Sequence, residues 1–441
     1  MTLKRMIGTI LFACLIYAEA AKANPAPTPS ATPSPEPLVT ITSPRSATVK
    51  KYALFPLEIP AYVMRGITWP FIQGIRLVEK KWMGKRPQAE PKKKKFSVFP
   101  IIQAGGGEGV GLGFSFKVDD LFQVGDLYTD YTFFFDVENR ANLAFTGNPI
   151  DLFGRPFQYE FVTFYRDRNE ATYYGIGSDT SEDGGEYAYD QLTTGINLYY
   201  EVLPHLKVSL PLQFLTAKTY SADGGERPPV QDIFLPDELP GFDQRTNYFV
   251  TGLGISHDTR SDMMYPLKGG YRSFRFTRFQ DVTSGSFSFN QYEIDIRQYI
   301  PLWAPRYVLM LRNDWVFQQS TGGGTIPFNL LADLDHYSPL RGFPVGRFRD
   351  ESSVIFNMEY RFPVWSYSSI WTEKEGTFID GLVFADTGRV FPGITDFSFD
   401  DWHYSAGGGL SIIVQNNFLM RLQAGYGGEG ALIFFKMGGS L

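Results

Sequence analysis

The stretch Leu340-Arg341-Gly342-Phe343 lies inside a long predicted loop, 320–350, and two segments that follow it carry acids able to pair with its arginine. The first segment, 354–362, reads VIFNMEYRF, so its even positions are apolar and its odd positions are polar except for Ile355. This alternation is typical of a strand with two different faces. The second segment, 384–388, reads FADTG and is also predicted to be in a strand.

These motifs together predict an ionic contact between the loop and the strands. Glu359 is expected on the polar face of its strand, and Asp386 on that of a neighbouring strand. The planar guanidinium of Arg341 can bridge two carboxylates with directional hydrogen bonds. A surface Arg-Gly turn or an ordinary strand acid would explain any one motif alone, whereas the three in this order form a specific set. In a partly wet interior the pair is expected to contribute about 1–3 kcal/mol.

The set resembles the barrel domain of the BamA/TamA family of bacterial outer-membrane assembly and translocation proteins. In that family a long loop folds back into the barrel lumen and carries a Val/Ile/Leu-Arg-Gly-Phe/Tyr motif at its tip. Its arginine meets a glutamate on the twelfth strand and the aspartate of a Phe-x-Asp-x-Gly motif on the thirteenth. The resemblance covers residues 96–441, and it implies a loop-anchoring role for Leu340, Arg341, Gly342, Phe343, Glu359, Phe384, Asp386 and Gly388.

The composition of the whole chain agrees with a membrane barrel. The 441 residues have a net charge of −6, which makes nucleic acid an unexpected partner, and 16% of them are aromatic. No run of about 18 apolar residues follows the N-terminal region, so membrane-spanning helices are not expected. Many alternating segments of about ten residues instead predict an all-β fold, a 16-stranded antiparallel transmembrane β-barrel. The expected strands are 96–103, 109–118, 126–137, 140–147, 157–167, 190–202, 206–219, 245–257, 270–281, 286–300, 306–318, 352–364, 379–390, 403–414, 417–427 and 430–437.

Four parts of the chain are expected in order. Residues 1–23 have the charged, apolar and small-residue regions of a signal peptide. Residues 24–45 form a Pro-rich disordered linker, and 46–95 an amphipathic helical segment with a basic linker. The transmembrane β-barrel fills 96–441. Cys14, the one cysteine, lies in the predicted signal peptide, so no disulfide is expected in the mature chain.

The amphipathic helix is predicted from an apolar stripe at spacings of three and four residues, which consists of Met64, Ile67, Phe71, Ile75, Val78 and Trp82. It is too short for the POTRA modules that precede the barrel in well-known members of the family. A plug in the lumen or a periplasmic cap is the favoured interpretation. A helix on the inner leaflet or a helix bound to a partner are the alternatives.

The two ends of the predicted barrel suggest a weak seam. The first strand contains Pro100, which cannot donate a ladder hydrogen bond, and runs into Gly105-Gly106-Gly107. The last strand, around 431–435, is short. Such a seam would suit a lateral gate, although fraying near the chain ends explains the pattern equally well.

The sequence carries no recognisable catalytic or metal-binding pattern. The histidines, His205, His257, His336 and His403, are scattered without metal-ligand spacing. Nucleophile-elbow and phosphate-loop motifs are not found in the chain. We therefore expect no enzyme, no cofactor and no metal.

Two functions remain open at this point. The first is an outer-membrane factor that helps insert or translocate polypeptides or lipids through a weak seam, with outer-membrane lipids and a client polypeptide as partners. The second is a passive channel or structural barrel plugged by the helix. Depletion of the protein and conductance of a chain lacking residues 46–90 would separate the two.

Overall fold

The computed structural model describes residues 58–66, 69, 73, 96–105, 109–135, 137–222, 225–304, 306–335, 340–367, 377–414 and 418–439. The predicted signal peptide, the Pro-rich linker and, apart from 58–66, 69 and 73, the predicted helical and basic segment 46–95 lie outside the described residues. Among the residues that the structure describes, no helix has the length and apolar character to cross a membrane.

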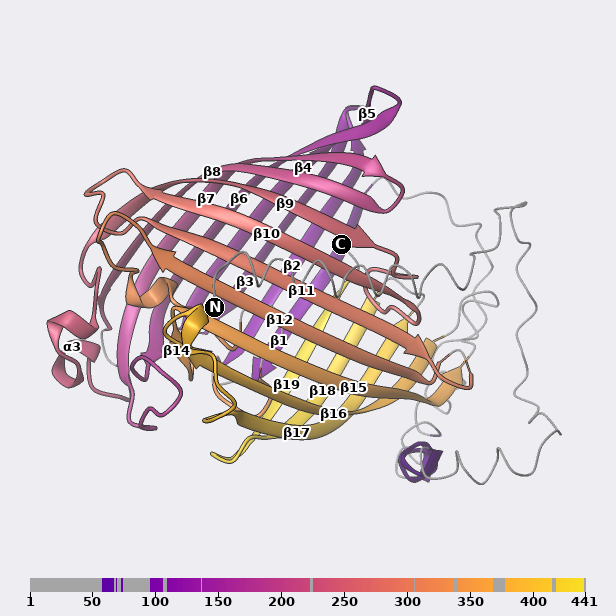
Figure 1. Cartoon of the computed structure of the whole chain (residues 1–441). Helices are drawn as coiled ribbons and strands as arrows, with labels where there is room; N and C mark the ends of the chain where they lie inside the picture. The colour runs from indigo at the N-terminus through magenta and orange to yellow at the C-terminus, as the bar shows by residue number, and fades with distance from the viewer. Residues whose placement is uncertain are drawn as a thin grey trace. The chain divides into compact units, whose positions relative to one another are not determined.

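The strands form one closed antiparallel barrel (Figure 1). Each long strand pairs with the next along the chain, and β1 pairs with β19 to close the ring. The sheet has 17 strands, of which β5 is a three-residue extension of the β4–β6 hairpin. The other sixteen are the predicted strands, so the predicted fold class is confirmed.

The bounds of the barrel strands are β1 Phe96–Gly105, β2 Val110–Leu121, β3 Gly125–Phe134, β4 Glu138–Gly147, β5 Ile150–Leu152, β6 Arg155–Tyr173, β7 Gly185–Leu203, β8 Leu206–Ser221, β9 Arg245–Asp258, β10 Gly269–Asp281, β11 Phe289–Pro301, β12 Val308–Ser320, β15 Ser352–Tyr367, β16 Thr377–Phe391, β17 His403–Val414, β18 Phe418–Tyr426 and β19 Ala431–Gly439. The connecting elements are α3 Val230–Ile233, η1 Pro236–Glu238, η2 Phe328–Leu330, β13 Ala332–Asp333, β14 Arg349–Asp350 and η3 Ile394–Asp396.

The barrel has a turn end, with short connections such as 204–205, and a loop end, with the long connections 222–244 and 321–351. β6 and β7 extend past their predicted limits at the loop end. There Tyr173 and Tyr187 are buried in a cluster with Phe328, which belongs to the 321–351 loop. The extra strand residues are therefore stabilised by loop packing, which the alternating pattern does not report.

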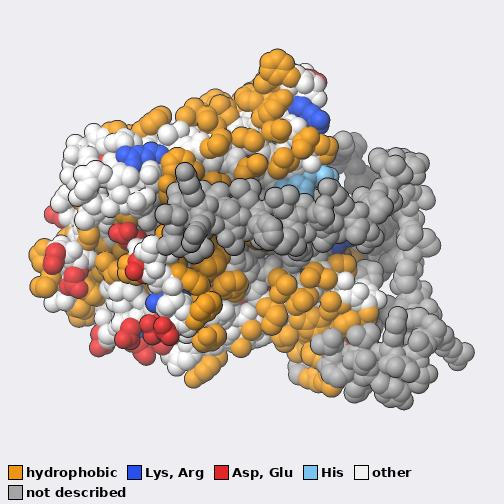
Figure 2. Space-filling model, viewed as in Figure 1, with side chains coloured by type: hydrophobic (Ala, Val, Ile, Leu, Met, Phe, Trp, Pro, Cys, Tyr) orange, Lys and Arg blue, Asp and Glu red, His pale blue; other side chains and the backbone are white. Residues whose placement is uncertain are grey.

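Side chains alternate between the wall and the lumen. On β11 Glu293 and Asp295 are buried, while Ile296 is exposed. Apolar side chains cover much of the outer face in Figure 2, and acidic side chains gather towards the loop end. Inward charges pair across neighbouring strands, as where Arg312 donates to Asp295 at 3.1 Å. Pairing allows a charged lumen inside an apolar wall.

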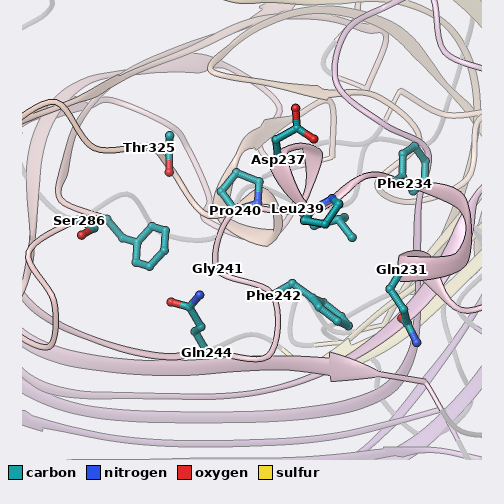
Figure 3. A pocket seen from close by; sticks show the side chains of 12 residues that line it. Gln231, Phe234, Asp237, Leu239, Pro240, Gly241, Phe242, Gln244, Ser286 and Thr325 are labelled. Carbon is teal, nitrogen blue, oxygen red and sulfur yellow. The ribbon is translucent and has the colours of Figure 1, made fainter.

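A cavity of about 580 Å³ lies among the loops of the loop end. Figure 3 shows residues 231–244 on one side of it and Ser286 and Thr325 on the other. Its lining combines apolar rings with uncharged amides and hydroxyls, and Asp237 is its one acid. This lining offers no group of titratable side chains for chemistry.

The described helical residues 58–66 pack on the outer wall of the barrel at the turn end. Ala61 is buried against Phe362, Val364 and Ile379. Phe362 has the strand parity of Met358, whose side chain is exposed on the outer face, and the opposite parity to Glu359 in the lumen. The predicted lumen plug is therefore wrong for these residues, and the alternative position beside a membrane leaflet fits their contacts.

Candidate functional site in the lumen

Arg341 lies at the tip of the 321–351 loop and bridges two wall strands. Its Nε and one terminal nitrogen donate to the two Asp386 carboxylate oxygens, each at 2.7 Å. Its other terminal nitrogen donates to Glu359 Oε2 at 2.8 Å. The three side chains are at most 5% exposed, so water screens these contacts little. The partly wet interior expected from the sequence is not what surrounds the arginine.

Phe384 completes the seat of the guanidinium. Its ring centroid lies 3.6 Å from Arg341 Cζ, which is a cation–π contact. The strand β16 thus presents an acid at one inward position and an aromatic face two residues earlier. This spacing places both side chains on the lumen face.

Gly342 allows the loop tip to approach β18. Its φ is +113°, a conformation that L side chains rarely adopt. A Cβ there would lie 2.7 Å from the Gly427 nitrogen and 2.8 Å from the Tyr426 carbonyl carbon. Any side chain at this position would push the loop away from the wall.

Leu340 and Phe343 pack in an apolar cluster beside the ion pair, together with Leu334, Phe348, Ile355 and Val390. The Phe343 ring stands edge-on to Phe348, with centroids 5.2 Å apart. Ile355 breaks the polar pattern of its strand because it packs against the loop rather than water.

Gly388 leaves room for the same cluster. A Cβ built on it would lie 3.2 Å from a Leu334 methyl and 3.0 Å from the Val354 carbonyl oxygen. The structure thus brings all eight predicted site residues to one part of the lumen, around the loop tip.

Glu359 has two further cationic neighbours that the sequence reasoning missed. Arg361 Nε donates to its Oε1 at 2.7 Å, and Arg421 of β18 approaches the same oxygen at 3.6 Å. Both arginines stand at inward-facing positions of strands in which polar and apolar residues alternate. Their place in that alternation is the signal that could have identified them as lumen residues. Glu359 is therefore a hub for three arginines.

The hub connects to the turn end of the barrel. Arg361 lies over the ring of Tyr265, with Cζ 4.6 Å from its centroid, and donates to the Pro266 carbonyl at 3.3 Å. Tyr265 donates to Asp380 at 2.9 Å, and Arg306 donates to the same carboxylate at 2.5 Å. A continuous polar chain thus runs from the loop tip to the 259–268 connection.

A second set of contacts holds the loop near the loop end. Arg347 Nε donates to both oxygens of Glu429, at 2.8 and 2.9 Å. The same guanidinium donates to the Thr180 hydroxyl and carbonyl, at 2.6 and 2.7 Å. Asp350 lies where the loop returns to β15, and its burial raises its pKa to about 6.

The arrangement suits structure rather than acid–base or metal chemistry. The carboxylates of Glu359 and Asp386 are held in ion pairs with arginines. Within the described ranges no group of three His, Cys, Asp or Glu side chains is placed to hold a metal ion.

Together, the closed barrel, its apolar outer wall and the loop folded into a charge-paired lumen define a transmembrane β-barrel with an internal loop. A family model for the Omp85 superfamily domain matches residues 105–427. The chain therefore belongs to the Omp85 superfamily, whose members are barrels of the bacterial outer membrane that act in protein insertion or secretion. Such barrels are transporters or assembly factors rather than enzymes.

Solved structures show the same fold at low sequence identity. BamA from Haemophilus ducreyi lacking POTRA domains 1–3 is 16% identical, with a TM-score of 0.56 over 79% of this chain and 70% of that one. CdiB from Escherichia coli is 13% identical, with a TM-score of 0.51 over 79% of this chain and 63% of that one. No curated protein sequence matches the chain.

Proposed function

We propose that this barrel assists the insertion or translocation of polypeptides, or of lipids, at the outer membrane through its β1–β19 seam. The observation that carries the proposal is the length of that ladder. In the described residues β1 and β19 share four residue pairs, from Ile102 opposite Met437 to Gly105 opposite Phe434. The flanking ladders β1–β2 and β18–β19 have nine pairs each.

The short ladder leaves part of β1 available. Residues 96–101 pair with β2 on one side and have no partner in the described part of β19 on the other. An unpaired strand edge is a template for a further strand. A client strand can therefore pair with β1 at a lower cost than at any nine-residue ladder.

We assign the loop-tip contacts a supporting role in this function. Arg341, Glu359 and Asp386 hold the 321–351 loop inside the lumen, where it contacts β15, β16 and the end of β18. The other predicted residues (Leu340, Gly342, Phe343, Phe384 and Gly388) shape the seat of the loop. A braced wall beside a weak seam would confine opening to the seam.

A disulfide across the seam tests the proposal. Gln103 and Lys436 are directly opposite each other on β1 and β19, so Gln103→Cys with Lys436→Cys can form a bridge under oxidation. The matched control is Gln423→Cys with Phe434→Cys, which joins β18 and β19 within a nine-pair ladder. Oxidation should abolish client assembly in reconstituted vesicles for the seam pair and leave the control active. Equal activity of both oxidised proteins would refute a role for the seam.

A further inference from the structure

The outer surface at the turn end carries a feature that the seam does not explain, the helix to which the described residues 58–66 belong. We propose that this helix is an in-plane membrane anchor that seals a bulge of β15 on one side and inserts an apolar stripe into the adjacent lipid leaflet on the other. The proposal is independent of the function assigned to the seam.

The first observation is the bulge that the helix covers. The ladder between β15 and β16 shifts register between Pro363 and Trp365. A bulge leaves backbone groups without ladder partners, and hydrocarbon cannot satisfy them. Arg65 Nε donates to the Val364 carbonyl at 3.0 Å, and another of its nitrogens donates to the Pro363 carbonyl at 3.1 Å. The helix thus supplies donors where lipid would supply none.

The second observation is the level at which the helix lies. Ala61 belongs to a buried cluster on which Tyr307, Tyr360 and Trp365 pack, and the Trp303 ring lies tilted against Tyr307 with centroids 4.7 Å apart. A ring of Tyr and Trp marks the boundary between hydrocarbon and water in membrane barrels. The helix is therefore at the height of the headgroups rather than in the periplasm.

The third observation is a second apolar stripe that faces away from the barrel. Ile59, Tyr62 and Val63 are 45%, 55% and 54% exposed, although Ala61 on the opposite side is almost fully buried. Spacings of three and four residues put the three exposed side chains on one face. This face continues the apolar outer wall, which already contacts lipid. The occupant we assign to it is accordingly the lipid of the same leaflet.

The arrangement explains why the two sides of the described helical residues 58–66 differ. One side needs small and polar groups to sit on the bulge, and the other needs large apolar groups to enter the leaflet.

Lipid-carried and aqueous quenchers test the proposal on the full chain. In a Cys14→Ser background, Val63→Cys is labelled with an environment-sensitive dye and the protein is reconstituted in phosphatidylethanolamine–phosphatidylglycerol vesicles. Met358→Cys, exposed on the outer wall, calibrates lipid contact, and Asp400→Cys, exposed in a loop, calibrates water. Heat-modifiable gel mobility verifies a folded barrel for each variant.

The Val63 label should show blue-shifted emission, strong quenching by nitroxide lipids and weak quenching by iodide, as at Met358. Adding Ile59→Ser and Tyr62→Ser should lower the lipid quenching while Ala61 and Arg65 keep the helix on the barrel. Iodide quenching like that of Asp400 would place the helix in water and overturn the proposal. Resistance to both quenchers would place it in an enclosed protein environment and would overturn the proposal as well.

Discussion

Replacing Arg341 by alanine removes the central contact of the loop tip. Asp386, which is 2% exposed in the intact protein, loses both of its short hydrogen bonds to the guanidinium, so its carboxylate is left without a compensating charge. Breaking one side of a buried ion pair costs about 3–5 kcal/mol. Holding a loop of about 30 residues closed costs about 3 kcal/mol of chain entropy. The loss is therefore large enough to release the loop tip.

The barrel itself should stay folded in Arg341→Ala, because its ladders do not include this residue. At about 1.4 kcal/mol per factor of ten, the loop-opening equilibrium should rise by roughly two to three and a half orders of magnitude. Native-state hydrogen exchange of amides 340–348 measures that rise directly. Arg245→Ala is the control, because it removes a partly exposed pair with Asp190 and should cost less than about 1 kcal/mol. Unchanged exchange at 340–348, or exchange that rises throughout the barrel, would refute the reasoning.

The remaining predictions concern the same loop and the fold. Arg341→Lys should restore little protection, since an ammonium cannot reach Asp386 with two parallel bonds, and exchange rates close to wild type would contradict this. Arg341→Ala combined with Asp386→Asn should be little worse than Arg341→Ala alone, whereas additive losses would mean that the two side chains do not interact. The Asp350 pKa is raised to about 6 from 3.8, so the folded loop binds its proton more tightly than the open loop. Loop stability should then be highest near pH 4 and fall as pH rises to about 6; protection factors of the loop measure this, and Asp350→Asn should flatten the fall. Purified protein should show a β-rich circular dichroism spectrum and heat-modifiable gel mobility, and a helix-rich spectrum would contradict the fold.

Much of the barrel could be predicted because its physical cause is local. Lipid on one side and a polar lumen on the other impose alternation on each strand, and the sixteen long strands follow it. Where contacts between distant parts of the chain also act, alternation alone does not predict the limits of the strands. Tyr173 and Tyr187 extend β6 and β7 because the 321–351 loop packs on them, which is a contact between distant parts of the chain.

The candidate site shows the same difference between local and long-range causes. Arg341, Glu359 and Asp386 could be predicted from motif order and strand parity. Arg421 could not be assigned to Glu359, because their proximity depends on the strands lining one lumen and not on spacing in the sequence. Ile355 departs from the polar pattern of its strand, and its contacts in the loop cluster explain this departure.

The helix was misplaced for a related reason. The sequence predicts the apolar stripe that contains Met64, whereas the exposed stripe of Ile59, Tyr62 and Val63 emerges only from the structure. A helix with apolar groups on two sides fits between a wall and a lipid leaflet better than in a polar lumen.

Site-specific photocrosslinking at the seam tests the central claim most directly. A photoreactive amino acid is placed at Gln103, on the β1 side of the short ladder, and at Gln423, within the nine-pair β18–β19 ladder, in intact cells. The account predicts that Gln103 captures a newly made outer-membrane polypeptide or a lipid and that Gln423 captures neither. Capture of β19 alone from Gln103, at the same yield with and without client synthesis, would contradict a seam that opens.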